Sequence, residues 1–143
     1  MEKDLKDLLL KDLCGRLPYK VKIEVTYSKD SGSSLRARLC SEGINILDTN
    51  ILWLFQQGEI YIKPYLFPLS SMTEEQKAEL ENLGWHFDNF EIHNVSEYLG
   101  TYREFVSHLD CFVLIDWLNK NNFDYRGLIS KGLALDATGL NIY

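Results

Sequence analysis

The amino-acid sequence predicts an α+β fold: an N-terminal helix, a small twisted antiparallel sheet and a mainly helical C-terminal half. Three observations support this class. Apolar residues recur at helical spacing over 2–14, and the apolar period changes to two after Pro18. Two overlapping capping boxes, which begin at Ser71 and Thr73, then mark the start of a later helix.

The chain length of 143 residues is enough for one good hydrophobic core and too small for two large domains. We therefore expect a single domain, 1–143. Its first part, 1–69, should combine a helix with a β-rich stretch, and its second part, 70–143, should be mainly helical.

The first predicted elements are a helix and a hairpin. A helix is expected near 3–14, and Gly15 suits a left-handed helix end. Residues 20–27 alternate apolar and polar side chains, as a half-buried strand does. Because 35–40 alternate in the same way beyond the glycine-containing turn 28–34, the two stretches predict an antiparallel hairpin. An SH3-like barrel is one shape that such a sheet can take.

The stretch from 44 to 66 is harder to assign. Ile44 and Ile46 suit a strand. Residues 50–58 fit a short capped helix or another strand, because periodicity does not separate the two over so few residues. Residues 59–66 are expected to be extended, with Pro64 at an edge or a bend.

The C-terminal half begins at the clearest boundary. The capping boxes start a helix over 74–83, which Gly84 ends. A strand is expected over 85–92. Helical spacing then continues over 96–121 and predicts a helix near 108–120. The glycine-containing tail should close over the core with a short helical turn.

Charge limits the classes of partner. The net charge of −6 argues against the basic footprint that wraps duplex nucleic acid. Only the window 16–38 is basic, with six basic and two acidic residues. Its cations Lys20, Lys22, Arg36 and Arg38 lie near tyrosines, so weak nucleic-acid binding by the hairpin 16–38 is the alternative function. We expect no nucleic-acid partner, because the rest of the chain is acidic.

The C-terminal segment contains a candidate protein interface. Tryptophan, tyrosine and arginine are frequent interface anchors. The candidate residues are Trp117, Phe123, Tyr125 and Arg126. In the alternative interpretation Trp117 and Phe123 fill the core, and Arg126 pairs with Asp116 or Asp124. Trp117 and Leu118 are expected on or next to the core-facing stripe of their helix.

Catalytic and cofactor motifs are absent from the sequence. Its nine glycines form no phosphate-binding motif, and its three histidines lack metal-ligand spacing. Three widely spaced cysteines predict buried thiols in a reducing compartment. No apolar run reaches the about 20 residues of a membrane span. The sequence therefore predicts a cytoplasmic protein that is not an enzyme, with no catalytic residues, cofactor, metal or membrane partner.

Three stretches carry a resemblance to a known family: LLLKDLCGRLPYKVK (8–22), IKPYLFPLSSMTEEQKAE (62–79) and DWLNKNNFDYRGLISKGLALDA (116–137). Together they cover about 55 of 143 residues. They resemble a family of small proteins without an assigned activity, common in gut Bacteroidales, their phages and integrated mobile elements. The resemblance implies a phage or mobile-element accessory protein whose partner is a host or phage protein, and it supplies no catalytic residue or cofactor.

Overall fold

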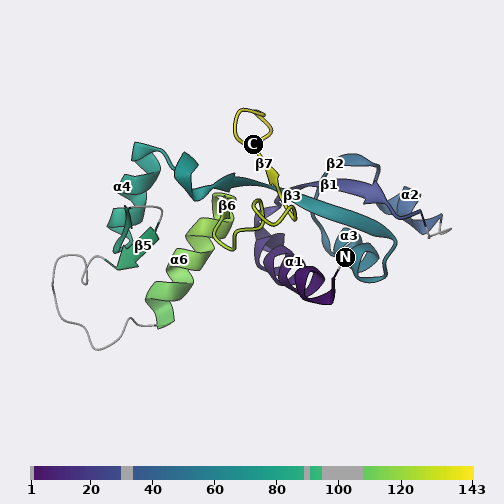
Figure 1. Ribbon diagram of the computed structural model, residues 1–143, viewed down its shortest axis with the longest axis horizontal. Helices are drawn as coiled ribbons and strands as arrows, with labels where there is room; N and C mark the ends of the chain where they lie inside the picture. Colours follow the sequence, from purple (N-terminus) through teal and green to yellow (C-terminus); the bar gives the residue numbers. More distant parts are fainter. Residues whose placement is uncertain (1, 30–33, 89–90, 95–107) are drawn as a thin grey trace.

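The computed structural model describes residues 2–29, 34–88, 91–94 and 108–143 (Figure 1). The chain is elongated, and the long strand β3 runs between two groups of elements. The helices are α1 (Lys3–Arg16), α2 (Leu35–Leu39), α3 (Thr49–Gln56), α4 (Glu74–Asn82) and α6 (His108–Lys120), with short 3-10 helices η1 (Leu17–Tyr19) and η2 (Leu69–Ser71). The strands are β1 (Lys22–Tyr27), β2 (Gly43–Ile46), β3 (Ile60–Pro68), β4 (Trp85–Asp88), β5 (Glu91–Asn94), β6 (Phe123–Asp124) and β7 (Leu135–Asp136). The predicted α+β class is confirmed.

The main sheet has the strand order β2-β1-β3-β6, and β7 also pairs with β3. β1 is antiparallel to both β2 and β3, whereas β6 and β7 run parallel to β3. The sheet is therefore mixed, which corrects the expectation of a purely antiparallel sheet. Among the described residues the strands at the two ends of this order do not pair with each other, so the sheet does not close into an SH3-like barrel. β4 and β5 form a separate antiparallel pair.

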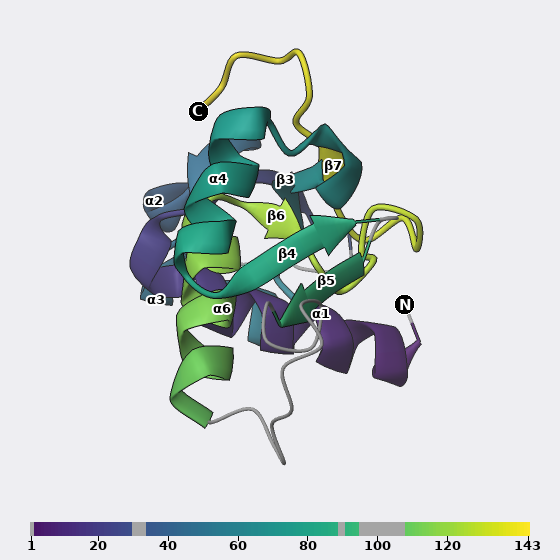
Figure 2. The same cartoon turned by 90° about the vertical axis from the view of Figure 1, so that its left-hand side faces the viewer.

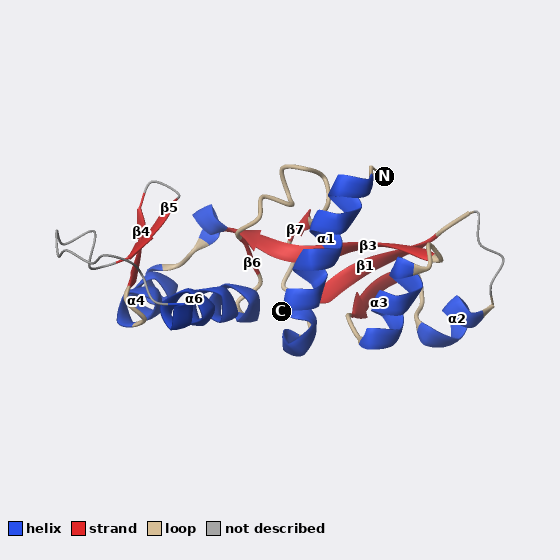
Figure 3. Cartoon of the chain, turned by 90° about the horizontal axis from the view of Figure 1, so that it is seen from below, coloured by secondary structure: helices blue, strands red, loops and turns tan. Residues whose placement is uncertain are grey.

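One face of the main sheet is covered by helices. Figure 3, which views the molecule from below, shows α1 and α3 lying in front of the sheet on this face. The first core cluster forms there, from α1, β1, α3, β3 and the turns near residue 130. Its fully buried members include Leu9, Leu13, Val21, Ile23, Leu54, Leu66 and Leu128.

A second core cluster lies at the other end of the molecule, where α4, α6 and the β4–β5 pair gather (Figure 2). Its buried members are Met72, Leu80, Trp85, Leu118 and Phe123. The C-terminal end of β3 reaches this cluster, because Phe67 packs against it and pairs with Phe123 of β6. β3 therefore contributes to both clusters.

The N-terminal helix is confirmed, but it ends later than predicted. Gly15 is helical, and the left-handed residue is Lys20, which follows η1 with φ of 55°. A Cβ on Gly15 would lie 3.3 Å from the Asn119 side-chain nitrogen. Glycine at this position therefore allows α1 and α6 to approach closely.

The predicted hairpin is half right. β1 confirms the strand over 20–27, whereas 35–40 is the helix α2 and not a strand. Leucine, alanine and arginine favour helix, and their alternation over six residues was too short to decide. The Arg36 guanidinium reaches back to the Ser28 carbonyl at 2.7 Å and fixes α2 at the end of β1. The hairpin partner of β1 is β2, which begins after α2.

The ambiguous stretch 50–58 is resolved as helix α3. The Asp48 side chain caps it by accepting a hydrogen bond from the Ile51 N–H at 2.8 Å. β2 and β3 confirm the extended structure predicted at Ile44 and Ile46 and over 59–66.

Pro64 lies inside β3 and not at the end of a strand. The Ser28 N–H donates to the Glu59 carbonyl at 3.1 Å. Because successive peptide groups alternate in direction, odd-numbered residues of β3 face β1 and Pro64 faces away from it. β3 as a whole is an internal strand of the sheet, so the expected edge position is not that of the strand. At Pro64 itself, the missing N–H removes no hydrogen bond to β1.

The helix predicted over 74–83 is confirmed as α4. It uses the Thr73–Gln76 capping box, and Gly84 follows it with φ of 91°. The Ser71 box is not formed, because the Ser71 hydroxyl donates to the Pro68 carbonyl at 2.7 Å. The strand predicted over 85–92 is instead the pair β4 and β5.

The last predicted helix is confirmed over 108–120 by α6, whereas the helical spacing over 96–107 lies outside the described residues. The tail closes over the first core cluster through Leu128, Leu133 and Ala134, and successive turns form at 128–132. β6 and β7 were not predicted. Each has only two residues, too few for a periodic signal.

Leu118 is the first residue that we would test for stability. It lies on α6 with 2% of its surface exposed. Leu118→Ala should lower the free energy of unfolding by about 2–5 kcal/mol, because it leaves a cavity in the second cluster. Phe112→Ala on the same helix, at a residue that is 63% exposed, should change it by no more than about 0.5 kcal/mol. Equal effects in urea unfolding would contradict the helix orientation.

Candidate functional site

A buried ion pair on α1 holds the C-terminal segment in place. Asp12 and Arg16 both have fully buried side chains, and Arg16 Nε donates to Asp12 Oδ2 at 2.7 Å. Arg16 Nη2 donates to Asp12 Oδ1 at 3.2 Å and to the Phe123 carbonyl at 2.6 Å. Because a buried charge is costly unless it is paired, these bonds fix β6 against the end of α1.

A tyrosine extends this polar cluster toward the surface. The Tyr125 ring lies 5.3 Å from the Arg16 guanidinium and 5.2 Å from that of Arg126. Arg126 Nε is 3.3 Å from Asp12 Oδ1, and the Tyr125 hydroxyl donates to Asn119 Oδ1 at 2.9 Å. We call Asp12, Arg16, Asn119, Tyr125 and Arg126 the α1 polar cluster. Its contacts connect α1 to α6 and to the segment after β6.

The four residues predicted as a protein interface do not form one exposed surface. Phe123 is 1% exposed, and Trp117 stacks on it with a centroid distance of 5.5 Å. Trp117 Nε1 also donates to a Glu79 carboxylate oxygen at 3.2 Å. Tyr125 and Arg126 belong to the α1 polar cluster. The core interpretation of Trp117 and Phe123 is therefore the one that the structure bears out.

The aspartates expected to pair with Arg126 have other partners. Asp124 is buried and accepts hydrogen bonds from the Leu128 and Ile129 N–H groups at 2.8 and 2.9 Å. Asp116 lies beside Tyr19, and burial followed by the Asp116 charge raises the pKa of that phenol. Asp12, from the other end of the sequence, pairs with Arg126 instead.

We expect the buried pair to be strongly coupled. The single variant Asp12→Leu leaves Arg16 buried without its carboxylate, so it should lower the free energy of unfolding by about 3–5 kcal/mol. In the double variant Asp12→Leu, Arg16→Met no buried charge of this pair remains. Urea unfolding should show that the double variant loses less stability than the sum of the single variants. Strict additivity would contradict the coupling.

A tyrosine hydroxyl occupies the point where β1 and β3 separate. Tyr143 donates to the Tyr65 carbonyl at 2.7 Å and accepts from the Lys22 N–H at 3.0 Å. Lys22 and Tyr65 come next in register after Ile23 and Pro64. The hydroxyl therefore bridges two backbone groups that would otherwise form the next bond of the ladder. Burial of the hydroxyl raises the pKa of Tyr143 to about 12, although the Lys22 backbone hydrogen bond and the Arg16 charge lower it.

The alkaline limit of stability should depend on Tyr143. An unfolded tyrosine ionises near pH 10, whereas the folded group keeps its proton until about pH 12. The folded state therefore binds more protons in this interval, and stability falls as the pH rises from about 10 to 12. Tyr143→Phe should reduce this fall, and should lower stability at neutral pH because it leaves two backbone groups without a partner. Identical slopes in denaturation series over this pH range would contradict the assignment.

The four cations of the predicted nucleic-acid hairpin are divided between the two ends of β1. Lys20 and Lys22 lie at its start, whereas Arg36 and Arg38 belong to α2 beyond its end. Two of them have internal roles. Lys22 Nζ donates to the Ile142 carbonyl, and Arg36 lies 4.6 Å above the Tyr27 ring. β1 begins at Lys22 and is six residues long, about 17 Å at the usual rise per residue, and α2 follows beyond its other end. The hairpin 16–38 is therefore not one basic surface.

Exposed apolar side chains lie on the face of the main sheet opposite α1 and α3, which we call the outer face. Ile44 and Ile46 of β2 are 54% and 51% exposed, and Tyr61 of β3 is 50% exposed. Glu24 lies opposite Ile44 and Lys22 opposite Ile46 in the register. These outer-face residues alternate with the buried side chains of β1 and β3, so the sheet itself is amphipathic.

The outer face ends at an open strand edge. The Leu47 N–H donates to the Val21 carbonyl at 3.0 Å. By alternation Gly43 and Asn45 turn their peptide groups toward β1, while Ile44 and Ile46 turn theirs away. Among the described residues β2 pairs only with β1. The N–H and C=O groups of Ile44 and Ile46 therefore face outward along what we call the β2 edge.

A hollow of about 410 Å³ lies on α4 and β4, away from the outer face, and is lined partly by Glu74, Lys77, Glu81 and His86. His86 Nδ1 is 2.9 Å from Glu81 Oε1, and Lys77 pairs with Glu74 at 3.1 Å. Lys77 is paired with Glu74, and the His86 ring contacts Glu81, so the polar groups of this hollow already have partners.

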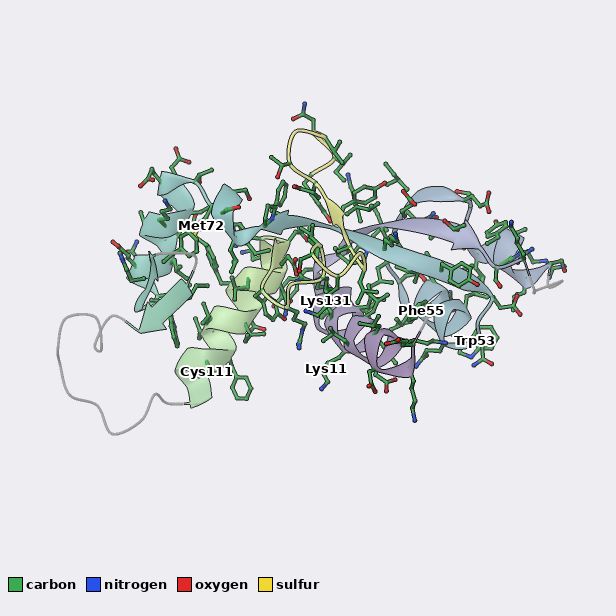
Figure 4. All side chains as sticks on the ribbon, viewed as in Figure 1. Lys11, Trp53, Phe55, Met72, Cys111 and Lys131 are labelled. Carbon is green, nitrogen blue, oxygen red and sulfur yellow. The ribbon has the colours of Figure 1, made fainter. Side chains whose placement is uncertain are left out.

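The cysteine prediction is partly wrong. Cys40 is buried, whereas Cys14 is exposed. Cys111, on α6, is also exposed (Figure 4). Burial, followed by the Asp48 charge, raises the pKa of the Cys40 thiol. Within the described ranges, no group of three or more histidine, cysteine or acidic side chains is placed to hold a metal ion, and no helix is long and apolar enough to cross a membrane.

Little in the sequence pattern indicates the outer face. Ile44 and Ile46 fit a strand, but nothing in their spacing says which side of the sheet the helices cover. The position of β2 at the end of the strand order, which exposes them, depends on long-range pairing.

Comparisons with known proteins add no assignment. No family model, curated protein or solved structure matches the chain.

Proposed function

We propose that this protein is a non-enzymatic interaction module that binds another protein on the outer face of its sheet. The observation that carries the proposal is the pair Ile44 and Ile46, each more than half exposed on the terminal strand β2. Apolar β-branched side chains on a strand edge lose unfavourable contact with water when a partner covers them.

The two edges of the main sheet differ in how they are protected, and this difference supports the proposal. On the far side of β3, Pro64 has no N–H to offer, and β7 occupies the following residues. Proline and short covering segments are common protections of strand edges. The β2 edge has neither protection among the described residues, and its outward backbone groups lie beside exposed isoleucines. An edge of this kind is suited to contact with another chain.

The biological setting follows from the sequence resemblance. We propose a cytoplasmic accessory protein of a bacterial phage or mobile element, with a host or phage protein as its partner. Recognition of this kind needs no cofactor and no catalytic residue. The alternative of nucleic-acid binding has less support, because its four cations lie at opposite ends of β1 and two of them have internal partners.

The test is affinity capture from a Bacteroidales lysate with three forms of the chain. The double variant Ile44→Thr, Ile46→Thr keeps β-branched residues but removes the exposed apolar surface. The control Trp53→Gln changes an exposed residue, 46% accessible, on α3 at the helix-covered side (Figure 4). We expect at least one protein to be captured by wild type and Trp53→Gln and to be reduced about tenfold or more with the double variant.

Parallel captures after nuclease treatment distinguish the alternative. Proteins whose capture survives nuclease and depends on the two isoleucines support the proposal. Capture that is equal for all three forms would contradict it. Capture that disappears with nuclease, together with direct retention of the purified chain by DNA at low salt, would favour nucleic-acid binding.

A further inference from the structure

We infer that the β2 edge accepts an extended partner segment as an additional strand, and that this segment has basic residues flanking its apolar ones. The inference rests on the proposed function and states the chemistry of the partner. It combines the direction of the backbone groups on β2 with the charges at the two ends of this strand.

The backbone of β2 supplies a defined set of hydrogen-bonding groups. Ile44 and Ile46 each direct one N–H and one C=O away from β1, so the strand offers two donors and two acceptors. An antiparallel segment can pair with all of them through two of its own residues, spaced two apart. The side chains of those two residues then lie on the outer face beside Ile44 and Ile46. Apolar side chains at those positions would be favoured.

The ends of β2 supply the charge preference. Exposed Glu42 precedes the strand, and exposed Asp48 follows it. Each carboxylate has one oxygen bonded to a backbone N–H: Glu42 Oε1 accepts from Tyr27 at 3.0 Å, and Asp48 Oδ1 accepts from Ile51 at 2.8 Å. These bonds hold both negative charges near the ends of the edge. The other residues of 39–143 add to the negative field, with thirteen acidic and six basic residues.

The same charges disfavour a second copy of this chain. Two β2 strands could pair antiparallel about a two-fold axis, with Ile44 opposite Ile46 of the other copy. Continuing that register places Glu42 opposite Asp48 at both ends of the pairing. Like charges opposite one another destabilise a strand pair. A segment with lysine or arginine at the flanking positions avoids this repulsion and gains attraction at both ends.

The probe is a synthetic peptide, lysine–threonine–isoleucine–threonine–isoleucine–threonine–lysine, with a fluorophore on one end. Two matched peptides accompany it. One replaces both lysines by glutamate. The other keeps every side chain but carries N-methyl groups on the isoleucines, which removes the donors that pair with β2. We expect fluorescence anisotropy to show binding of the basic peptide and at least about tenfold weaker binding of both matched peptides, since both charge and backbone pairing are required.

Two protein variants locate the site. Ile46→Pro removes an N–H that faces away from β1, so the main ladder keeps its bonds while the edge loses a donor. We expect it to abolish binding. Glu42→Gln, Asp48→Asn keeps the oxygens that accept from Tyr27 and Ile51 but removes both charges. This double variant should bind the basic peptide about threefold to tenfold more weakly, and most of the salt dependence of binding should be lost. Circular dichroism and the thermal midpoint of each variant verify that the fold is intact.

The outcomes separate this inference from the proposed function. Equal affinity for the basic and acidic peptides, or undiminished affinity of the N-methylated peptide, would overturn the inference. The inference would also be overturned if no peptide bound while lysate capture still depended on Ile44 and Ile46. In that case the outer face would bind its partner without strand addition. If sedimentation shows a wild-type dimer that Ile46→Pro converts to monomer, the occupant is a second copy and the inference is wrong.

Discussion

The buried pair of Asp12 and Arg16 is the interaction on which the arrangement of this chain depends. It lies at the end of α1, between the two core clusters, and its second partner is the Phe123 carbonyl on β6. Hydrophobic contact alone is non-directional and would permit the clusters to slide on each other. Asp12 fixes the direction of the Arg16 donors, and any other placement of β6 would leave the Nη2 donor without the Phe123 carbonyl. The close approach of α1 and α6 at Gly15 and the position of Tyr125 between two arginines follow from this placement.

The elements predicted from the sequence are those whose signals are local. Spaced leucines gave α1, the Thr73–Gln76 capping box gave the start of α4, and alternation gave β1. Local signals failed where two structures share them: leucine, alanine and arginine over 35–40 alternate like a strand but form the helix α2, held by the contacts of Arg36. They were absent for β6 and β7, whose two residues each are extended because β3 lies beside them. Long-range pairing decides such segments, and periodicity has no access to it.

The candidate site residues show the same difference between local sequence signals and long-range structure. Trp117 and Phe123 have the residue types of an interface, yet they stack in the second core cluster. The cations of 16–38 are close in sequence, but the length of β1 separates them and internal carbonyls occupy two of them. Ile44 and Ile46 looked like ordinary strand residues. Their exposure depends on which sheet face the helices cover and on which strand is terminal, and both are properties of the whole topology.

The parallel pairing of β6 and β7 with β3 has a consequence for how the chain acquires its structure. The three antiparallel strands β2, β1 and β3 lie close together in sequence, with β1 in the middle of the sheet, and can pair early, as local contacts do. Leu128, Leu133 and Ala134 of its core, and the Phe123 carbonyl that Arg16 binds, are synthesised much later. During synthesis this three-stranded sheet therefore exists for a time with an incomplete core and with the Arg16 guanidinium lacking one acceptor. The β2 edge is complete in that early form, so a partner that binds there would meet the nascent chain before its last residues are in place.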